Sequence, residues 1–423
     1  NNLDTNSRLC MSSAVAGYKA TLGSDAPPAC YDDLAQAQTL FIVGANTAYA
    51  HPILFRRIED ARKANPAMKL IVADPRKTET AEMADLFLPI LPGTDVALFH
   101  GMLHVMLAER LIDMAYVQQH TQGFEALQAI VADFSPEVVA SVCGISKDDL
   151  VQAARWFGGN TPTLSLYCQG LNQSASGTDK NAALINLHLA TGQIGTPGAG
   201  PFSLTGQPNA MGGREVGGMA TLLSAHRDLD NADHRAEVAA LWGIDEVPFK
   251  PGKTAVEMFE AAARGEIKAL WIACTNPAQS LPDQATVRKA LETAELVIVQ
   301  EAFATTATCA YADLLLPATT WGEKDGTVTN SERRISRLRP AISPAGQSRH
   351  DWAIFTDVGQ RLEKRMPHRT ARYSQGVSTL FPYDTPESVW NEHRESTRGR
   401  DLDITGLSYG ILQEQGPQQW PTP

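Results

Sequence analysis

In the first 170 residues, short apolar runs alternate with longer segments of helical period. The apolar runs, rich in β-branched residues, lie at 40–44, 70–75, 86–89 and 163–168. Residues 52–62 and 98–107 carry apolar side chains at the spacing of a helix, and Pro52 stands in the first turn, where a helix tolerates proline. This alternation predicts parallel strands joined by helices, in a sheet that is covered on both faces.

A second block of the chain repeats this pattern. Its runs at 269–276, 296–301 and 312–317 parallel those at 39–46, 70–74 and 84–89. The motif A-D-L-x-L-P occurs in both blocks, 38 residues after Asn46 and 36 residues after Asn276. Any two α/β domains look alike at this resolution, but a shared motif at a matched distance favours a duplicated nucleotide-binding domain. The predicted fold class is α/β, with two related Rossmann-like parallel-sheet domains.

A glycine-rich connection, residues 192–218, lies between the two blocks. It has too many glycines for helix or strand interiors, and its apolar residues, such as Phe202 and Met211, are unlike a flexible linker. We expect a loop held close against a ligand. After Arg333, prolines and turn formers predict irregular structure. The predicted domains are 6–205, 206–320 and 321–423, the last an irregular region leading to a domain outside this sequence.

Composition and charge exclude several classes of function. The chain has 423 residues, of which 43% are hydrophobic and 20% charged, as in a globular protein rather than a disordered one. Its formal net charge of −11 makes sequence-independent nucleic-acid binding unfavourable, because such binding needs a basic surface. No apolar run approaches the about 20 residues of a membrane span. We therefore expect neither nucleic acid nor a membrane as a partner.

The cysteines and the chain ends bear on the compartment. Six cysteines are spread thinly along the chain, and no pair forms C-x-x-C, which excludes zinc ribbons and thioredoxin-type motifs. Sparse cysteines suit a reducing compartment and predict a cytoplasmic location. The chain starts Asn1-Asn2-Leu3, with neither an initiator methionine nor a signal peptide. We expect it to be a piece of a longer polypeptide.

Small and polar residues follow the predicted strands. They lie at 44–46, 74–77, 93–95, 169–170, 275–277 and 300–301. Ligands of open parallel sheets bind at this edge, where carboxylates suit ribose or guanine and glycines suit phosphate. The fingerprint G-x-G-x-x-G is missing, so a classical NAD site is disfavoured. Each residue alone is more often a turn former, but six loops in two matched sets favour nucleotide binding.

Cys10 is the second candidate for chemistry. A free cysteine is usually a small core residue. Here the neighbours Arg8, Ser12 and Ser13 are polar and Met11 is soft, and the two serines are predicted to cap a helix whose positive end favours thiolate. A thiolate is a natural ligand for a redox-active transition metal. Cys10 is therefore a candidate metal ligand, with a core cysteine as the alternative.

Several motifs together resemble the molybdopterin oxidoreductase family. They are N-S-R-L-C-M-S-S-A-V-A-G-Y at 6–18, A-N-T-A-Y-A-H-P at 45–52, L-P-G-T-D at 91–95, P-F-S-L-T-G-Q-P-N-A-M-G-G-R-E-V-G at 201–217 and W-G-E-K-D-G at 321–326. Within the family they are most similar to bacterial assimilatory nitrate reductase catalytic subunits, with periplasmic nitrate reductases as near relatives. The resemblance covers essentially the whole chain. It implies a fold of the formate dehydrogenase and DMSO reductase type, of which this chain holds the central domains only.

The resemblance also implies a cofactor, molybdenum bis(molybdopterin guanine dinucleotide), and its site residues. Cys10 matches the molybdenum ligand, and Met11 and Arg214 match positions near the metal pocket, although Arg214 is equally well explained as a loop arginine that neutralises phosphate. The residues matched to the first dinucleotide and the pterin are Asn6, Val43, Gly44, Asn46, Asp74, Arg76, Gly93, Asp95, Gln169 and Gln173. Those matched to the second dinucleotide are Asn276, Gln300, Glu301, Lys324 and Asp351.

The implied reaction is the reduction of nitrate to nitrite by oxygen-atom transfer. The implied electron donor is ferredoxin, flavodoxin or an NADH-dependent reductase subunit. The family's 4Fe-4S cysteine motif and its C-terminal barrel-like domain are expected in segments outside this sequence, and we expect the isolated piece to be inactive. One alternative is another family reaction such as formate oxidation, although formate enzymes usually have histidine where this chain has Met11. The other is a cofactor-free nucleotide-fold module.

Overall fold

The computed structural model describes residues 2–366 and 379–423, which divide into two compact units. The Cys10 unit comprises Leu9–Ala210 together with Ser331–Arg333. The Arg214 unit comprises the first eight residues, Met211–Asn330 and Arg334–Pro423. Among the described residues, no single helix is both long and apolar enough to cross a membrane, and one bent helix pair meets those criteria only when its two members are joined.

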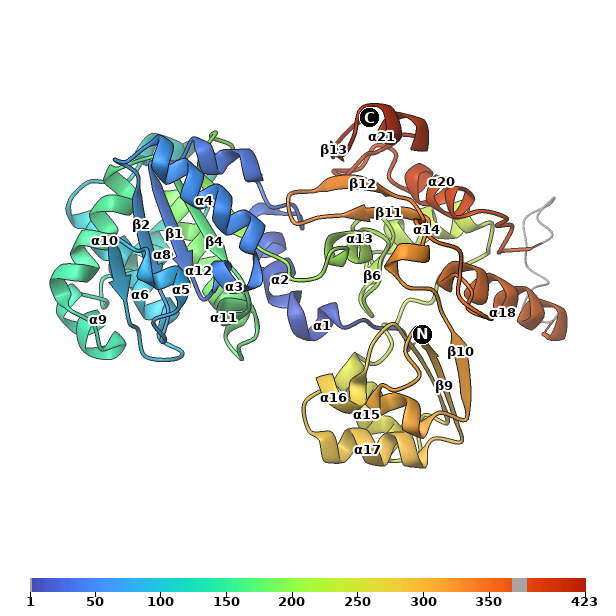
Figure 1. Ribbon diagram of the computed structural model, residues 1–423. Helices are drawn as coiled ribbons and strands as arrows, with labels where there is room; N and C mark the ends of the chain where they lie inside the picture. Colours follow the sequence, from blue (N-terminus) through green and yellow to red (C-terminus); the bar gives the residue numbers. More distant parts are fainter. Residues whose placement is uncertain (1, 367–378) are drawn as a thin grey trace. The chain divides into compact units, whose positions relative to one another are not determined.

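The Cys10 unit is built on a five-stranded parallel sheet (Figure 1). Its strand order is β3-β2-β1-β4-β5, and every neighbouring pair is parallel. The strands are β1 (Thr39–Val43), β2 (Lys69–Ala73), β3 (Leu86–Leu88), β4 (Thr163–Tyr167) and β5 (Gly200–Ser203). The strand order reverses between β1 and β4, and open α/β sheets bind ligands outside the carboxyl ends of their strands at such a point.

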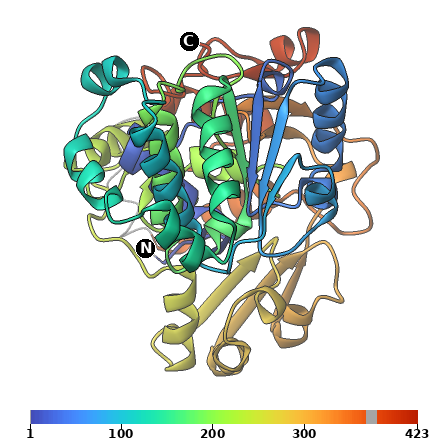
Figure 2. The same ribbon diagram turned by 90° about the vertical axis from the view of Figure 1, so that its left-hand side faces the viewer.

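Helices cover both faces of this sheet (Figure 2). They are α1 (Ser7–Cys10, which begins in the other unit), α2 (Ser12–Leu22), η1 (Tyr31–Ala35), α3 (Thr47–Ala50), α4 (Pro52–Ala64), α5 (Glu79–Glu82), α6 (Asp95–Ala108), α7 (Met114–His120), α8 (Phe124–Val131), α9 (Pro136–Cys143), α10 (Lys147–Gly159), α11 (Gln169–Asn172) and α12 (Gly177–Ala190). Alternate residues of β1 point to opposite faces: Phe41 and Val43 join the core under α6, α10 and α12, whereas Leu40 and Ile42 join the core under α4. The predicted alternation of strands and helices is confirmed.

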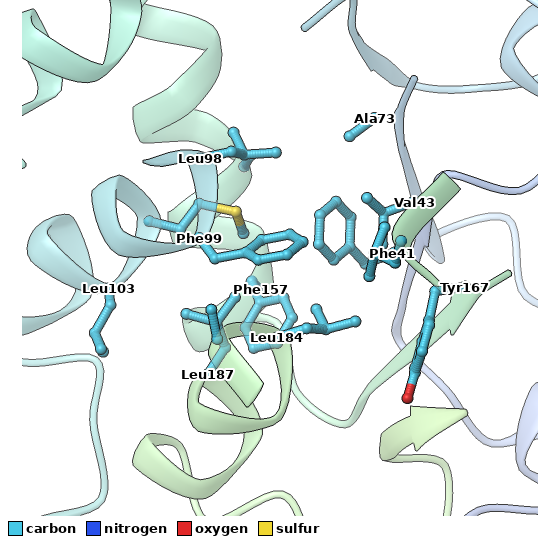
Figure 3. Packing of buried hydrophobic residues seen from close by; sticks show 14 of the residues in the cluster. Phe41, Val43, Ala73, Leu98, Phe99, Leu103, Phe157, Tyr167, Leu184 and Leu187 are labelled. Atoms are coloured by element: carbon cyan, nitrogen blue, oxygen red, sulfur yellow. The ribbon is translucent and has the colours of Figure 1, made fainter. Parts of the chain in front are cut away.

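Aromatic packing fixes the first of these two cores (Figure 3). The ring of Phe41 meets Phe99 of α6 and Phe157 of α10 edge to face, with centroid distances of 6.2 and 6.0 Å. Edge-to-face pairs are favoured by the ring quadrupole and add about 0.5–1.5 kcal/mol each beyond burial. The central strand is thereby locked to both helices, which keeps its carboxyl end in place.

The loops that follow β1 and β4 touch backbone to backbone. Gly170 N donates to Gly44 O at 2.9 Å, and Gly44 has a positive φ of 58°. A Cβ on Gly170 would lie 2.5 Å from Gly44 Cα, and a Cβ on Gly44 would lie 2.9 Å from Gly170 Cα. Glycine is therefore required on both sides of this contact.

A buried ion pair supports the same loop from within the Cys10 unit. Lys180 Nζ of α12 lies 2.6 Å from Asp95 Oδ2 of α6, and the two side chains are only 4% and 8% exposed. The ammonium group also donates to Gly170 O at 3.4 Å. The pair thus joins the starts of two helices to the loop after β4. Paired and hydrogen-bonded burial is the condition under which such charges are tolerated in a protein interior.

The Arg214 unit contains a three-stranded parallel sheet of order β10-β9-β8 and a three-stranded antiparallel sheet of order β11-β12-β13. Its strands are β6 (Leu222–Leu223), β7 (Arg227–Asp228), β8 (Ala269–Ala273), β9 (Leu296–Glu301), β10 (Leu314–Pro317), β11 (Gly326–Thr329), β12 (Arg334–Leu338) and β13 (Gln418–Gln419). Its helices are α13 (Ala210–Glu215, whose first residue is in the Cys10 unit), α14 (Ala232–Trp242), α15 (Ala255–Ala263), α16 (Pro277–Ser280), α17 (Gln284–Thr293), η2 (Ala307–Tyr311), η3 (Trp321–Glu323), α18 (Asp351–Arg365), α20 (Pro386–Ser396) and α21 (Tyr409–Glu414). Residues from α15 and α17 pack on one face of the parallel sheet, while Trp271 on the other face stacks on Phe355 of α18.

The same pattern of side-chain hydrogen bonds occurs in each unit, in the loops beside its parallel sheet. In the Cys10 unit, Thr80 Oγ1 donates to Asn46 Oδ1 at 2.9 Å and accepts from Ala48 N at 3.0 Å. In the Arg214 unit, the equivalent bonds join Thr308 to Asn276 at 2.7 Å and to Ala278 N at 3.1 Å.

The strands carry a second matched pair of bonds. Asp85 accepts from Leu70 N, and Asp313 accepts from Val297 N, both at 2.8 Å. The same local hydrogen-bond pattern in two units of one chain supports the duplication predicted from the repeated motif. The second parallel sheet, over the described residues, has counterparts of β1, β2 and β3 only.

Three expectations differ from the structure. The glycine-rich segment 192–218 contains strand β5 and helix α13, because pairing with β4 satisfies a backbone that its composition disfavours as a strand. The segment 321–423, expected to be irregular, forms the antiparallel sheet and the long helices α18 and α20. The structure groups 321–330 and 334–423 with 211–320 in one unit. The part of the predicted irregular region at 367–378 lies outside the described residues.

We predict that Gly170→Ala lowers the free energy of unfolding by about 1–3 kcal/mol, because the new methyl group meets the backbone of Gly44. Gly159→Ala, at the end of α10, is the matched control, since its new Cβ would lie at an ordinary contact distance of 3.8 Å from Leu111. Urea unfolding measures both variants. Equal stability of Gly170→Ala and the native chain would show that the two loops are not in rigid contact.

We also predict that Lys180→Met destabilises the chain by about 3–5 kcal/mol, because it leaves the Asp95 carboxylate buried without its partner. The double variant Lys180→Met/Asp95→Leu removes both charges and should recover most of that loss. Thermal and urea unfolding of the two variants measure the difference. A double variant no more stable than the single one would contradict a buried ion pair.

Candidate functional site

Cys10 lies at the carboxyl edge of the Cys10 unit's sheet, beside the loop that follows β4. Its side chain is 7% exposed and lies at the end of α1. Gln169 Nε2, from the first residue of α11, donates to Cys10 Sγ at 3.2 Å. Cys10 Sγ in turn donates to Gln207 Oε1 at 3.4 Å. The sulfur is therefore held between two amides, and although it borders the apolar core it is not enclosed by hydrocarbon alone.

The amide of Gln169 is itself oriented by a second cysteine. Cys168 Sγ donates to Gln169 Oε1, and it also lies 2.8 Å from Leu204 O. Burial raises the pKa of Cys168 to about 12, with the nearby Cys10 acting in the same direction. This thiol is accordingly a proton donor at neutral pH. Cys168 and Gln207 were not predicted as part of the site around Cys10, because no local sequence pattern links residues so far apart in the chain.

Helix α2 anchors the Cys10 segment against α11 and α12. Met11 is fully buried and its Sδ accepts from Asn172 Nδ2 at 3.6 Å, while Ser13 Oγ donates to Asn172 O at 2.8 Å. A Cβ on Gly17 would lie 2.5 Å from Asn181 Cβ, so α2 and α12 pack closely. The prediction that Ser12 and Ser13 cap α2 is wrong: Met11 is the N-cap residue, and no side-chain cap bond forms there. These contacts explain Met11 as an anchor, and its catalytic role stays a prediction.

The other residues predicted in the Cys10 unit line the same edge of the sheet. Val43 is the buried last residue of β1, and Asn46 bonds Glu79 and Thr80 at the start of α3. Asp74 accepts from the backbone of the exposed Arg76, as in a turn. Gly93 has a positive φ of 86°, and Gln173 is exposed at the end of α11. Asp95 differs from its neighbours, because its carboxylate is committed to Lys180.

In the Arg214 unit, four side chains converge at the carboxyl edge of β8 and β9. Lys324 Nζ pairs with Asp351 Oδ2 at 2.7 Å, and Gln300 Nε2 donates to Asp351 Oδ1 at 2.7 Å. Burial alone would raise the pKa of Asp351, but the bonds from Lys324 and Gln300 outweigh it and the pKa is lowered. Cys274 Sγ adds a contact to Asp351 Oδ1 at 3.3 Å. The structure brings Gln300, Lys324 and Asp351 together, and their place along the second guanine dinucleotide stays a prediction from the family resemblance.

Cys274 is the member of this cluster that sequence reasoning missed. It occupies the position of Gly44 in the duplicated unit. Both residues have a φ near 60°, and each backbone N–H donates at 3.1 Å to a carbonyl of the neighbouring strand, Gln300 O of β9 or Ala73 O of β2. The repeat could have identified this residue, because aligning 269–276 with 39–46 places Cys274 opposite Gly44. Burial, followed by the charge of Asp351, raises the pKa of the Cys274 thiol to about 12.

The remaining predicted residues of the Arg214 unit have simple local roles. Asn276 caps α16 and accepts from Thr308, and Glu301 accepts from the backbone of Ala302 at 2.7 Å. Asn6 is exposed in the segment before α1. Asn276 thus lies at a helix start, Glu301 at the end of β9 and Asn6 in a turn.

Arg214 is buried in α13, where its Nη2 donates to Met211 Sδ at 3.4 Å. The next residue, Glu215, is also buried and accepts from Trp420 Nε1 at 2.6 Å and from Thr329 Oγ1 at 2.9 Å. Burial raises the pKa of Glu215, and these two donors act in the opposite direction. A buried arginine beside a buried carboxyl group sets the local charge, and sequence reasoning had noted only the arginine.

The side chains at this edge fit a metal whose other ligands belong mostly to a cofactor. Across the described residues, no group of three or more His, Cys, Asp or Glu side chains gathers as a metal site. All six cysteines are free thiols, so Cys10 can offer one soft donor at the sheet edge. The close contact of Gly44 with Gly170 keeps the loops after β1 and β4 together beside this sulfur. One thiolate beside an open nucleotide-fold edge suits a metal held by a dinucleotide-type cofactor.

Comparison with known proteins agrees with this reading of the donor set. The molybdopterin oxidoreductase family matches residues 1–361. A nitrate reductase from Synechocystis sp. is 48% identical over the whole chain and 57% of its own length. The assimilatory nitrate reductase catalytic subunit of Bacillus subtilis is 37% identical, again over the whole chain and 57% of its own length. The chain therefore spans little more than half of the relatives it matches.

A solved structure shows the same fold. Acetylene hydratase from Pelobacter acetylenicus superimposes with a TM-score of 0.74 at 22% identity, over 99% of this chain and 56% of that protein. The predicted α/β fold class and the resemblance drawn from the motifs are both confirmed. With a family match over most of its residues and relatives aligned from end to end, the chain belongs to the molybdopterin oxidoreductase family.

Proposed function

We propose that this chain is the central part of a molybdenum-dependent nitrate reductase of the assimilatory type, which reduces nitrate to nitrite. The observation that carries the proposal is the Cys10 thiol, held at the sheet edge between the amides of Gln169 and Gln207. Relatives described as nitrate reductases, at 37–48% identity, support the choice of substrate.

The chain itself would bind and orient the cofactor. When bound, the molybdenum–pterin group supplies the two-electron chemistry that removes one oxygen atom from nitrate. Cys10 would supply a thiolate ligand, and Gln169 would hold that sulfur in place. Met11 and Asn172 fix the helix that follows Cys10, so the sulfur has little freedom to move.

We propose that the cofactor is the bis(guanine dinucleotide) form, one dinucleotide for each duplicated unit. The loops after β1 to β4 in the Cys10 unit and the cluster around Asp351 support this, because each lies at the carboxyl edge of its own parallel sheet. A carboxylate such as Asp351 is a suitable acceptor for the N–H groups of guanine. The matched Asn46–Thr80 and Asn276–Thr308 bonds show that the two edges are built alike.

Arg214 is the proposed source of positive potential for the nitrate anion. The chain carries a net charge of −11, so attraction of an anion must be local. The neighbouring Glu215 accepts from Trp420 and Thr329, and burial raises its pKa.

The proposal extends to the setting of the enzyme. A 4Fe-4S cluster would pass electrons to the metal, and ferredoxin, flavodoxin or an NADH-dependent reductase subunit would supply them, in the cytoplasm. A viologen assay on the complete gene product tests the reaction. Nitrate-dependent oxidation of reduced viologen is expected, whereas formate-dependent dye reduction without nitrate activity would favour the alternative reaction.

We predict that Cys10→Ser in the complete gene product lowers nitrate reduction by at least about 100-fold, because a hydroxyl is a poor substitute for a soft thiolate donor. Cys30→Ser, in the same unit, is the matched control and should retain activity, since the Cys30 side chain accepts from the backbone at the start of η1. Reduced-viologen kinetics and molybdenum analysis give the readouts. Full activity of Cys10→Ser would remove Cys10 from the site.

We predict that Arg214→Gln raises KM for nitrate and lowers kcat/KM by about tenfold, or about 1.4 kcal/mol, while Arg214→Lys keeps part of the effect. Arg361→Gln, which removes an exposed arginine of α18, is the control with the same charge change. If the molybdenum content falls and KM is unchanged, Arg214 neutralises a cofactor phosphate instead.

A further inference from the structure

The two amides that flank Cys10 present opposite atoms to its sulfur. Gln169 directs its Nε2 donor at Sγ from 3.2 Å, whereas Gln207 directs its Oε1 acceptor at Sγ from 3.4 Å. An acceptor can bond only a protonated sulfur, and a sulfur that ligates a metal carries no proton. The Gln207 contact is therefore specific to the free thiol. The Gln169 contact is compatible with a metal-bound sulfur.

The direction of the Gln169 amide is set by its neighbours. Its Oε1 accepts from the thiol of Cys168, which leaves Nε2 turned toward Cys10. The backbone of this loop is fixed by the bond from Gly170 N to Gly44 O and by the ammonium group of Lys180 on Gly170 O. The fold thus fixes the backbone that carries the Gln169 side chain, and Cys168 contacts the amide at its end.

We propose that Gln169 is a positioning residue that hydrogen-bonds the metal-ligating sulfur of Cys10 and raises the reduction potential of the metal, with Cys168 fixing which end of the amide faces that sulfur. This inference rests on the proposed function. A hydrogen bond to a ligating sulfur withdraws electron density from it, which favours the reduced metal. Removing the bond therefore lowers the potential.

The test is a redox titration of the Mo(V) signal by electron paramagnetic resonance, on the complete gene product loaded with molybdenum. Gln169→Leu is expected to lower the equilibrium constant for one-electron reduction by about threefold to tenfold, tenfold being 59 mV. Gln207→Leu and the exposed Gln128→Leu of α8 should leave the potential unchanged. An equal fall in Gln207→Leu, or no fall in Gln169→Leu, would overturn the inference.

A second pair of variants decides the case if Gln169→Leu fails to load molybdenum. Cys168→Ser keeps a donor to Gln169 Oε1 and should retain the native potential, whereas Cys168→Ala frees the amide to turn and should lower it. Native potentials in both variants would refute the role of Cys168 and of a fixed amide. A native protein that shows no Mo(V) signal and no nitrate reduction instead contradicts the proposed function, and this inference falls with it.

Discussion

The contact between Gly44 and Gly170 is the constraint on which the rest of the site depends. It joins the loops that follow the two central strands at the point where the strand order reverses, and neither loop can carry a side chain there. Because residue 170 is fixed, Gln169 and Cys168 are fixed with it. Helix α2, packed on α11 and α12, then brings Cys10 to the same place. A flexible thiol near the chain's start thus becomes a preorganised donor.

The Arg214 unit has different residues at the equivalent positions of its sheet edge. Cys274 adopts the left-handed conformation that glycine supplies at position 44, and it contacts Asp351 within a cluster that also holds Lys324 and Gln300. One edge thus presents bare backbone and a candidate metal ligand, whereas the other presents a paired carboxylate. Duplication followed by divergence accounts for two sheet edges that share one hydrogen-bond pattern but present different side chains.

The strands and the first helices were predictable because their signals are local. Runs such as 40–44 and 296–301 are apolar and β-branched, and Pro52 stands in the first turn of α4 as predicted. Strand β5 and the buried Lys180–Asp95 pair were not predictable, since their stability comes from partners far along the chain. The same holds for the site: the motif around Cys10 marked the residue, but the amides that hold its sulfur lie 159 and 197 residues away.

The proposed function depends on the sulfur of Cys10 being a ligand of a molybdenum ion at the carboxyl edge of β4. A crystal structure of the molybdenum-loaded protein, with the metal located by its anomalous scattering, measures this position. We expect the metal within bonding distance of Cys10 Sγ, beside Gln169. Molybdenum bound elsewhere, with Cys10 Sγ still donating to Gln207, would contradict it.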